Sequence, residues 1–249
     1  MDGCRGGWFA VAIASTVDWQ VARRDNLDDL EAASPPAKLK LIDIPIGLPE
    51  RSARRCDREA RQLLGRPRAS SVFPVPCRDA VYAPDYPSAC ALNAKALGVK
   101  LPRQSWGIVP KIREMDQHLR NSGAAAWRES HPELAFRAFS RDHPLQHGKK
   151  TQAGKTERLA LLSGYFGATK PLFESARAQF LRRQVADDDI IDALALAVSA
   201  WLSQGQLARV PAEPDTDALG FPMEIVFLPP HRQRRSSTGP DYGERSASH

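Results

Sequence analysis

Several features are missing from this chain of 249 residues, and each absence argues against a class of protein. No apolar run approaches the roughly 20 residues that span a bilayer. The start of the chain, with Asp2 and Arg5 in a Gly-rich stretch, is unlike a secretory signal. The four cysteines show neither C-x-x-C spacing nor histidines placed as companion zinc ligands. We therefore expect a cytoplasmic protein with free thiols and no membrane association.

Basic residues outnumber acidic residues in this chain. The chain has 35 Lys and Arg against 29 Asp and Glu, a formal net charge of +6. This excess favours a polyanionic partner such as nucleic acid, although many soluble proteins share it. A hydrophobic fraction of 42% is ordinary for a globular protein, and the length suits one substantial core. We predict one domain over residues 1–229 and a disordered basic and polar tail over 230–249.

The pattern of apolar residues predicts an α/β fold. Strands are expected at 8–14, 18–23, 39–44, 124–129 and 223–228, and helices at 26–33, 51–64, 88–97, 104–120, 155–164, 172–184 and 187–202. Such an order predicts a mixed β-sheet flanked by helices. A helical insertion is expected at about 49–123, between the strands at 39–44 and 124–129, which count as strands four and five when a short first strand holds Asp2. An insertion of this length is expected to cover or feed a site. Right-handed crossovers would place strands one, four and five side by side.

Carboxylates stand at the ends of these expected strands. Asp43 lies between two isoleucines, so burial is implied and its charge needs a cation or hydrogen-bond donors. Asp2 alone suits an Asp-Gly turn, and Glu129 alone suits an exposed strand end. Together they predict a metal site gathered on the sheet, because carboxylates that hold divalent metal are a common device of phosphoryl chemistry.

The last long helix adds further acids. Asp188, Asp189 and Asp192 fall at i, i+1 and i+4, so pairs of them share a face. Asp187 and Asp188 suit an ordinary helix start equally well, because acids there oppose the helix dipole. Asp192 lies a full turn deeper and gains little from the dipole. It therefore points more clearly to a cation.

Polar and basic side chains offer a surface for phosphate. Arg68 with Ser70 and Ser71 combines a guanidinium and two hydroxyls in one loop. Lys149 and Lys150 suit the same role, or are simply surface lysines. The arginines of 51–61 are interrupted by acids, which slightly favours a solvated helix face.

Short blocks distributed in order up to about residue 229 carry a resemblance to a known family. They are 2–8 (DGCRGGW), 42–49 (IDIPIGLP), 68–74 (RASSVFP), 110–114 (PKIRE), 129–133 (ESHPE), 149–151 with 157–158 (KKT, ER) and 188–194 (DDIIDAL). The chain resembles the DUF429 family, described as predicted nucleases with a ribonuclease-H-like fold. Family members usually carry several apolar residues before the first acid, whereas only Met1 precedes Asp2 here. Either the recorded start is internal to a longer product, or the first strand is clipped and holds Asp2 poorly.

The resemblance implies a ribonuclease-H-like sheet around Mg²⁺ or Mn²⁺. Its metal ligands and catalytic acids would be Asp2, Asp43, Glu129, Asp189 and Asp192. The implied activity is hydrolysis of nucleic-acid phosphodiester bonds by a two-metal mechanism.

Two other functions remain open from the sequence. A sugar-kinase or actin-like ATPase shares this sheet topology, but no second Gly-rich phosphate loop or duplicated domain is evident. A non-catalytic module that binds nucleic acid or a protein would use the acids as ion-pair partners of the arginines. Binding of Mn²⁺ separates such a module from an enzyme.

Overall fold

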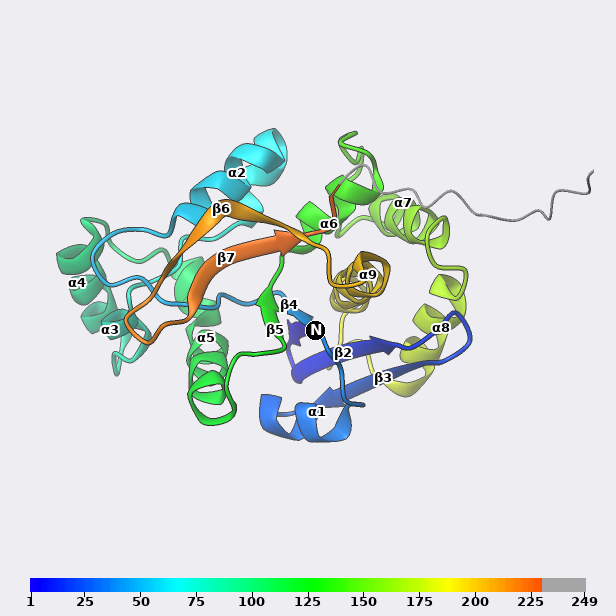
Figure 1. Cartoon of the computed structure of the whole chain (residues 1–249), viewed down its shortest axis with the longest axis horizontal. Coiled ribbons are helices and arrows are strands. Elements are labelled where there is room, and N and C mark those ends of the chain that lie inside the picture. The colour runs from blue at the N-terminus through cyan, green and yellow to red at the C-terminus, as the bar shows by residue number, and fades with distance from the viewer. Residues whose placement is uncertain (230–249) are drawn as a thin grey trace, which may run out of the picture.

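Short strands form the centre of the molecule (Figure 1). A computed structural model describes residues 1–229, so the tail predicted over 230–249 lies outside the described residues. One antiparallel sheet has the order β1 (Asp2–Cys4), β2 (Gly7–Ile13) and β3 (Trp19–Arg24). The other strands form two pairs, β4 (Lys40–Ile42) parallel to β5 (Trp127–Glu129) and β6 (Ala208–Thr216) antiparallel to β7 (Pro222–Phe227).

Backbone hydrogen bonds bring the three sheets edge to edge. The Met1 nitrogen donates to the Leu41 carbonyl at 2.6 Å, and the Asp43 N–H donates to the Met1 carbonyl at 3.1 Å, which joins β1 to β4. Ser130, just after β5, forms a parallel bridge with Val226 of β7. The neighbouring strands therefore run in the order β3, β2, β1, β4, β5, β7, β6. This arrangement confirms the expected α/β fold of mixed strands flanked by helices.

Helices account for most of the remaining chain. Their bounds are α1 (Leu27–Ala33), α2 (Arg55–Arg68), α3 (Arg78–Val81), α4 (Tyr86–Leu97), α5 (Arg103–Ser122), α6 (Pro132–Phe139), α7 (Gln152–Ser163), α8 (Thr169–Gln179) and α9 (Asp187–Ser203), with the 3₁₀ turn η1 (Ala69–Ser71). Between β4 and β5 the chain forms α2 to α5, where the helical insertion is expected. Helix α9 packs against β1, β2, β4, α6, α7 and α8. It therefore lies at the centre of one face of the strands (Figure 1).

Alternating side chains of the central strands build a core on each face. In β2, Phe9 packs in the cluster that contains α9, whereas the adjacent Trp8 packs with α1 and α5. In β4, Leu41 faces the α9 cluster and Ile42 faces the opposite one. Successive strand residues point to opposite faces, and both faces are covered. This explains why the strands read as continuous apolar runs.

Strand β6 was not predicted from the sequence. It contains Pro211 and Pro214, and proline removes a donor from the ladder. The register of β6 shifts between Val210 and Asp215, and the strand lies at the outer edge, beside β7 alone among the described strands. Proline is tolerated at edges and irregularities, so a proline-containing strand is possible here.

Candidate functional site

Strand geometry directs two of the predicted acids to the same face of the sheet. Asp2 lies directly across from Phe9 in the antiparallel β1–β2 pair, so both side chains are on the α9 face. Asp43 comes two residues after Leu41, whose side chain also packs in the α9 cluster. Because β1 and β4 are neighbours through the Asp43 N–H bond, the two carboxylates converge.

The acids of α9 join this pair. Burial raises the pKa of Asp2 well above its usual range, and the carboxylates of Asp43, Asp192 and Asp189 raise it further. Such mutual repulsion requires the charges to be near one another. The structure therefore brings together four of the five predicted acids, from β1, the end of β4 and the first turns of α9. We call Asp2, Asp43, Asp189 and Asp192 the acid cluster.

Asp192 is the most buried member of the acid cluster, with 2% exposure. Burial raises its pKa to about 6, with Lys149 acting in the opposite direction and Asp43 and Glu133 adding to the rise. Asp189 has a second task, because its Oδ2 accepts the Ala186 N–H at 2.8 Å and caps the helix. The cap and the cluster are therefore built from the same turn of α9.

Lys149 forms an ion pair within the acid cluster. Its Nζ lies 2.9 Å from Asp192 Oδ2. Burial acts to lower the pKa of Lys149, but Asp192, Asp43 and Asp2 outweigh it and raise the pKa above the usual value. Lys149 was predicted to bind substrate phosphate, and its ammonium group lies against the acid cluster.

The remaining carboxylates of the acid cluster have little compensation. Within residues 1–229, no donor is hydrogen-bonded to the side chain of Asp2 or Asp43. Besides Lys149, the buried α-ammonium of Met1 interacts with Asp2 and Asp43, although burial lowers its pKa to about 6. The four carboxylates therefore outnumber the positive charges beside them. Hard oxygen donors in this number suit Mg²⁺ or Mn²⁺ and suit a soft metal poorly. However, in the described part of the chain no group of three Asp, Glu, His or Cys side chains is already positioned to hold a metal ion.

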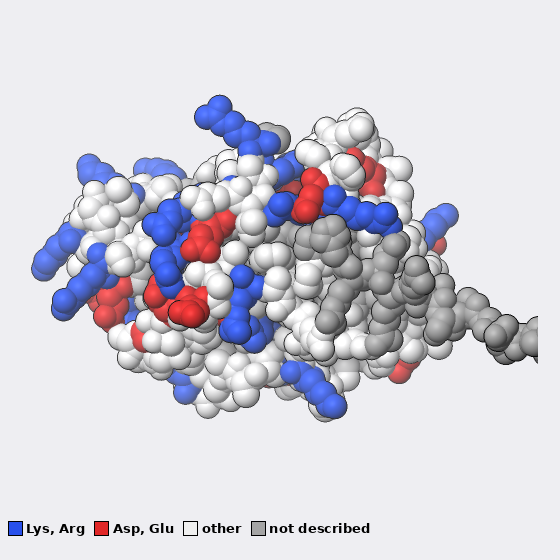
Figure 2. Space-filling model, turned by 45° about the horizontal axis from the view of Figure 1, so that its top comes forward, with Lys and Arg blue, Asp and Glu red and all other residues white. Residues whose placement is uncertain are grey.

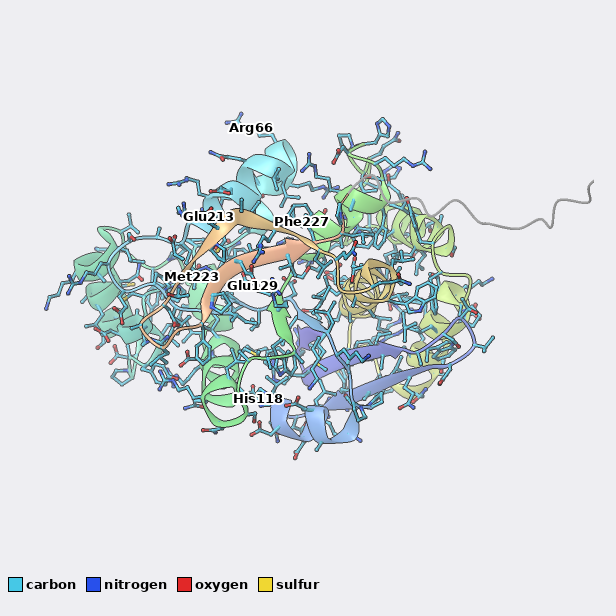
Figure 3. All side chains as sticks on the ribbon, viewed as in Figure 1. Arg66, His118, Glu129, Glu213, Met223 and Phe227 are labelled. Carbon is cyan, nitrogen blue, oxygen red and sulfur yellow. The ribbon has the colours of Figure 1, made fainter. Side chains whose placement is uncertain are left out.

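Glu129 does not join the other acids, which corrects its expected place among them. In the parallel β4–β5 pair it lies in register with Ile42, and both Ile42 and Trp127 face the cluster opposite α9. Arg54 binds the Glu129 carboxylate in a bidentate manner, with Nη2 at 2.6 Å from Oε1 and Nη1 at 2.9 Å from Oε2. Figure 3 shows Glu129 at β5, beside β7. Sequence reasoning identified the strand end but not the face.

Glu133 is the nearby acid that sequence reasoning missed. It lies in the first turn of α6 and acts electrostatically on Asp192. Its Oε1 accepts a hydrogen bond from Arg158 Nη2 at 2.7 Å. The signal was available, because Glu133 follows Glu129 in the same block of sequence, 129–133.

The predicted phosphate-binding residues do not all lie together. Arg68 donates to the His147 carbonyl at 2.9 Å and lies 3.7 Å from Glu133, so it holds the loop before Lys149. Ser71 donates to the Arg68 carbonyl within the η1 turn, which also contains Ser70. Lys150 is exposed and lines an open groove beside α9.

A family model described as "Protein of unknown function (DUF429)" matches residues 1–216. The chain belongs to the DUF429 family. Neither the curated proteins nor the solved structures gave a match. Residues 2–216 of this DUF429 protein include every member of the acid cluster and Lys149, so the whole site lies within the matched segment.

Two further expectations concern this DUF429 chain as a whole. All four cysteines are free thiols, as predicted. Across residues 1–229, none of the helices has the length and apolar character needed to cross a membrane.

Proposed function

We propose that this DUF429 protein is a metal-dependent nuclease that hydrolyses phosphodiester bonds of nucleic acid. The observation that carries the proposal is the convergence of Asp2, Asp43, Asp189 and Asp192 on the α9 face of the sheet, where β1 and β4 adjoin. Placing four carboxylates together is costly unless a cation relieves their repulsion. A site retained at this cost is a good candidate for function.

The arrangement of strands supports a ribonuclease-H-like reading of the fold. Three antiparallel strands are followed in space by β4 and β5, and the long helix α9 crosses the face that bears the acids. The acids come from the first strand, the end of the fourth and the helix. The same three elements would carry the metal ligands in the resemblance drawn from the sequence.

The acid cluster supplies the ligand chemistry that such a nuclease requires. Asp2, Asp43, Asp189 and Asp192 would hold Mg²⁺ or Mn²⁺ through their carboxylate oxygens. Bound divalent ions would activate water and stabilise the leaving oxygen of an in-line displacement. The ion pair with Lys149 gives Asp192 a partner when the carboxylates face one another without metal.

A cleavage panel tests the proposed activity. Labelled linear and structured DNA and RNA are incubated with the protein and Mg²⁺ or Mn²⁺. We expect metal-dependent cleavage that is lost in Asp43→Asn and in Asp192→Asn. Asp18→Asn, an exposed acid after β2, serves as the control with the same charge change. Full activity in both cluster variants would refute the assignment.

The Lys149–Asp192 ion pair also favours a second function. With an ammonium group at 2.9 Å and no ready group of three ligands within residues 1–229, the acid cluster could be a structural ion-pair network. The protein would then be a non-catalytic module that binds nucleic acid or a protein partner. Binding of Mn²⁺ separates the two functions, because a structural network has no need of a divalent ion.

A further inference from the structure

An open groove of about 450 Å³ lies beside the acid cluster. One side of the groove is the start of α9, with the N-cap residue Ala186 and the acids Asp187, Asp188 and Asp189. Asp189 also belongs to the acid cluster. The rest of the lining is basic and comes from three separate stretches of chain. The basic residues are Arg5, Lys150, Lys155, Arg182 and Arg183.

Fixed backbone contacts hold the walls of this groove. Arg5 lies in the β1–β2 turn, and the next N–H, that of Gly6, donates to the Gln184 carbonyl at 3.0 Å. The turn is thereby tied to the segment that carries Arg182 and Arg183. Lys150 immediately precedes Thr151, which caps α7 by accepting the Gly154 N–H at 3.0 Å. The basic walls are therefore anchored to the same strands and helices as the acid cluster.

The positive charges in the groove are only partly neutralised. Asp187 accepts hydrogen bonds from Lys155 at 2.7 Å and from Arg182 at 2.5 Å. Asp189 is engaged by the helix cap. Within residues 1–229, Arg5, Lys150 and Arg183 have neither an ion pair nor a side-chain hydrogen bond, and all three are exposed. Asp188 is the remaining groove acid set against these three unpaired cations.

Positive charge by itself does not single out a binding face on this molecule. On the face shown in Figure 2, Lys and Arg side chains are spread among several acidic groups. Many of the chain's arginines are committed to such pairs, as Arg54 is to Glu129 and Asp57. The groove differs because unpaired cations gather in a concave place that shares Asp189 with the acid cluster.

We propose that this groove binds the sugar-phosphate backbone of a nucleic acid strand and leads it to the acid cluster. The inference rests on the proposed nuclease function, and it adds Arg5 and Arg183 as substrate-binding residues. Lys and Arg that neutralise phosphates bind without regard to sequence, and they make binding weaken as salt rises. Because Lys155 and Arg182 neutralise Asp187, an anion in the groove meets less repulsion from the start of α9.

Binding of a labelled oligonucleotide, measured by fluorescence anisotropy in EDTA at several salt concentrations, tests the groove. The double variant Arg5→Ala/Arg183→Ala removes two exposed cations without breaking a hydrogen bond or an ion pair among residues 1–229. The matched control is Lys38→Ala/Arg51→Ala, which removes two exposed cations outside the groove. We expect the groove variant to bind about tenfold more weakly, with its salt dependence on duplex reduced by about two counterions. The control is expected to bind as the wild type does.

The outcomes separate this inference from the nuclease proposal, because EDTA removes any contribution of metal. Three outcomes would each overturn the proposal that the groove binds nucleic acid. They are unchanged binding by the groove variant, an equal loss in the control, and no binding of any oligonucleotide by the wild type. A loss confined to the groove variant supports it, even if the acid cluster fails to bind Mn²⁺. In that case the groove stands as a nucleic-acid surface and the nuclease proposal fails alone.

Discussion

Lys149 Nζ lies 2.9 Å from Asp192 Oδ2, so a lysine from the loop before α7 places its ammonium group in the acid cluster. The lysine side chain is 42% exposed, whereas that of Asp192 is 3% exposed. A flexible, half-exposed ammonium group can move away when a stronger cation arrives, while the buried carboxylate stays. Lys149 and a divalent ion are therefore expected to compete for the same oxygens.

Removal of Lys149 tests this competition. In Lys149→Met we expect Mn²⁺ to bind about tenfold more tightly, a change of about 1.4 kcal/mol. Without metal, the variant should unfold more easily by about 1–2 kcal/mol, because Asp192 loses its partner in a partly exposed pair. Calorimetric titration and urea unfolding measure the two effects. The control is Lys170→Met, which removes an exposed lysine of α8. Equal Mn²⁺ affinity in the wild type and Lys149→Met would contradict the competition between Lys149 and the metal ion.

The β1–β2 turn that positions Asp2 depends on Gly7. This residue has φ +127°, and an added Cβ would lie 2.1 Å from the Arg24 carbonyl oxygen. We expect Gly7→Ala to lower the free energy of unfolding by about 3 kcal/mol, because neither the backbone conformation nor the space suits alanine. Gly107 offers a matched control within α5, where nothing beyond the backbone of the helix itself and the two chain neighbours lies within 4 Å of the added Cβ. There Gly107→Ala should raise the free energy of unfolding by roughly 0.5–1 kcal/mol. Similar urea midpoints for Gly7→Ala and Gly107→Ala would contradict this account.

The free energy of unfolding is expected to depend on pH through Glu129, the buried partner of Arg54. Burial raises the pKa of Glu129 to about 7, although Arg54 acts in the opposite direction. Because the unfolded chain loses this proton near pH 4 and the folded protein near pH 7, ionisation of Glu129 reduces stability as pH rises between those values. Glu129→Gln lacks this ionisation. In urea unfolding, the free energy of unfolding of Glu129→Gln should therefore rise relative to that of the wild type from pH 4.5 to pH 7. If the difference between the two proteins stays constant over this range, the raised pKa of Glu129 is contradicted.

The sequence was sufficient to predict most elements and the convergence of acids in outline. Continuous apolar runs identified β2 and β4, and the stripe of Ile191, Leu194 and Val198 identified α9. The edge strand β6 was missed because its prolines argue against a strand, and only its neighbour β7 makes the ladder possible.

The face on which each acid lies was harder to predict. Glu129 ends β5 and Asp43 directly follows β4, yet the register pairs Glu129 with Ile42 and directs it away from α9. A shift of one residue changes the face, and sequence alone does not fix that register. The groove cations Arg5 and Arg183 carried no local signal either, because they are brought together by the contact between the β1–β2 turn and the segment before α9.

Calorimetric titration with Mn²⁺ tests the central claim most directly. The account predicts micromolar binding by the wild-type protein, loss of that binding in Asp43→Asn, and full retention in Asp18→Asn, whose side chain is exposed and outside the acid cluster. Absence of Mn²⁺ binding by the wild type, or equal binding by Asp43→Asn, would contradict the claim that these carboxylates form a metal site.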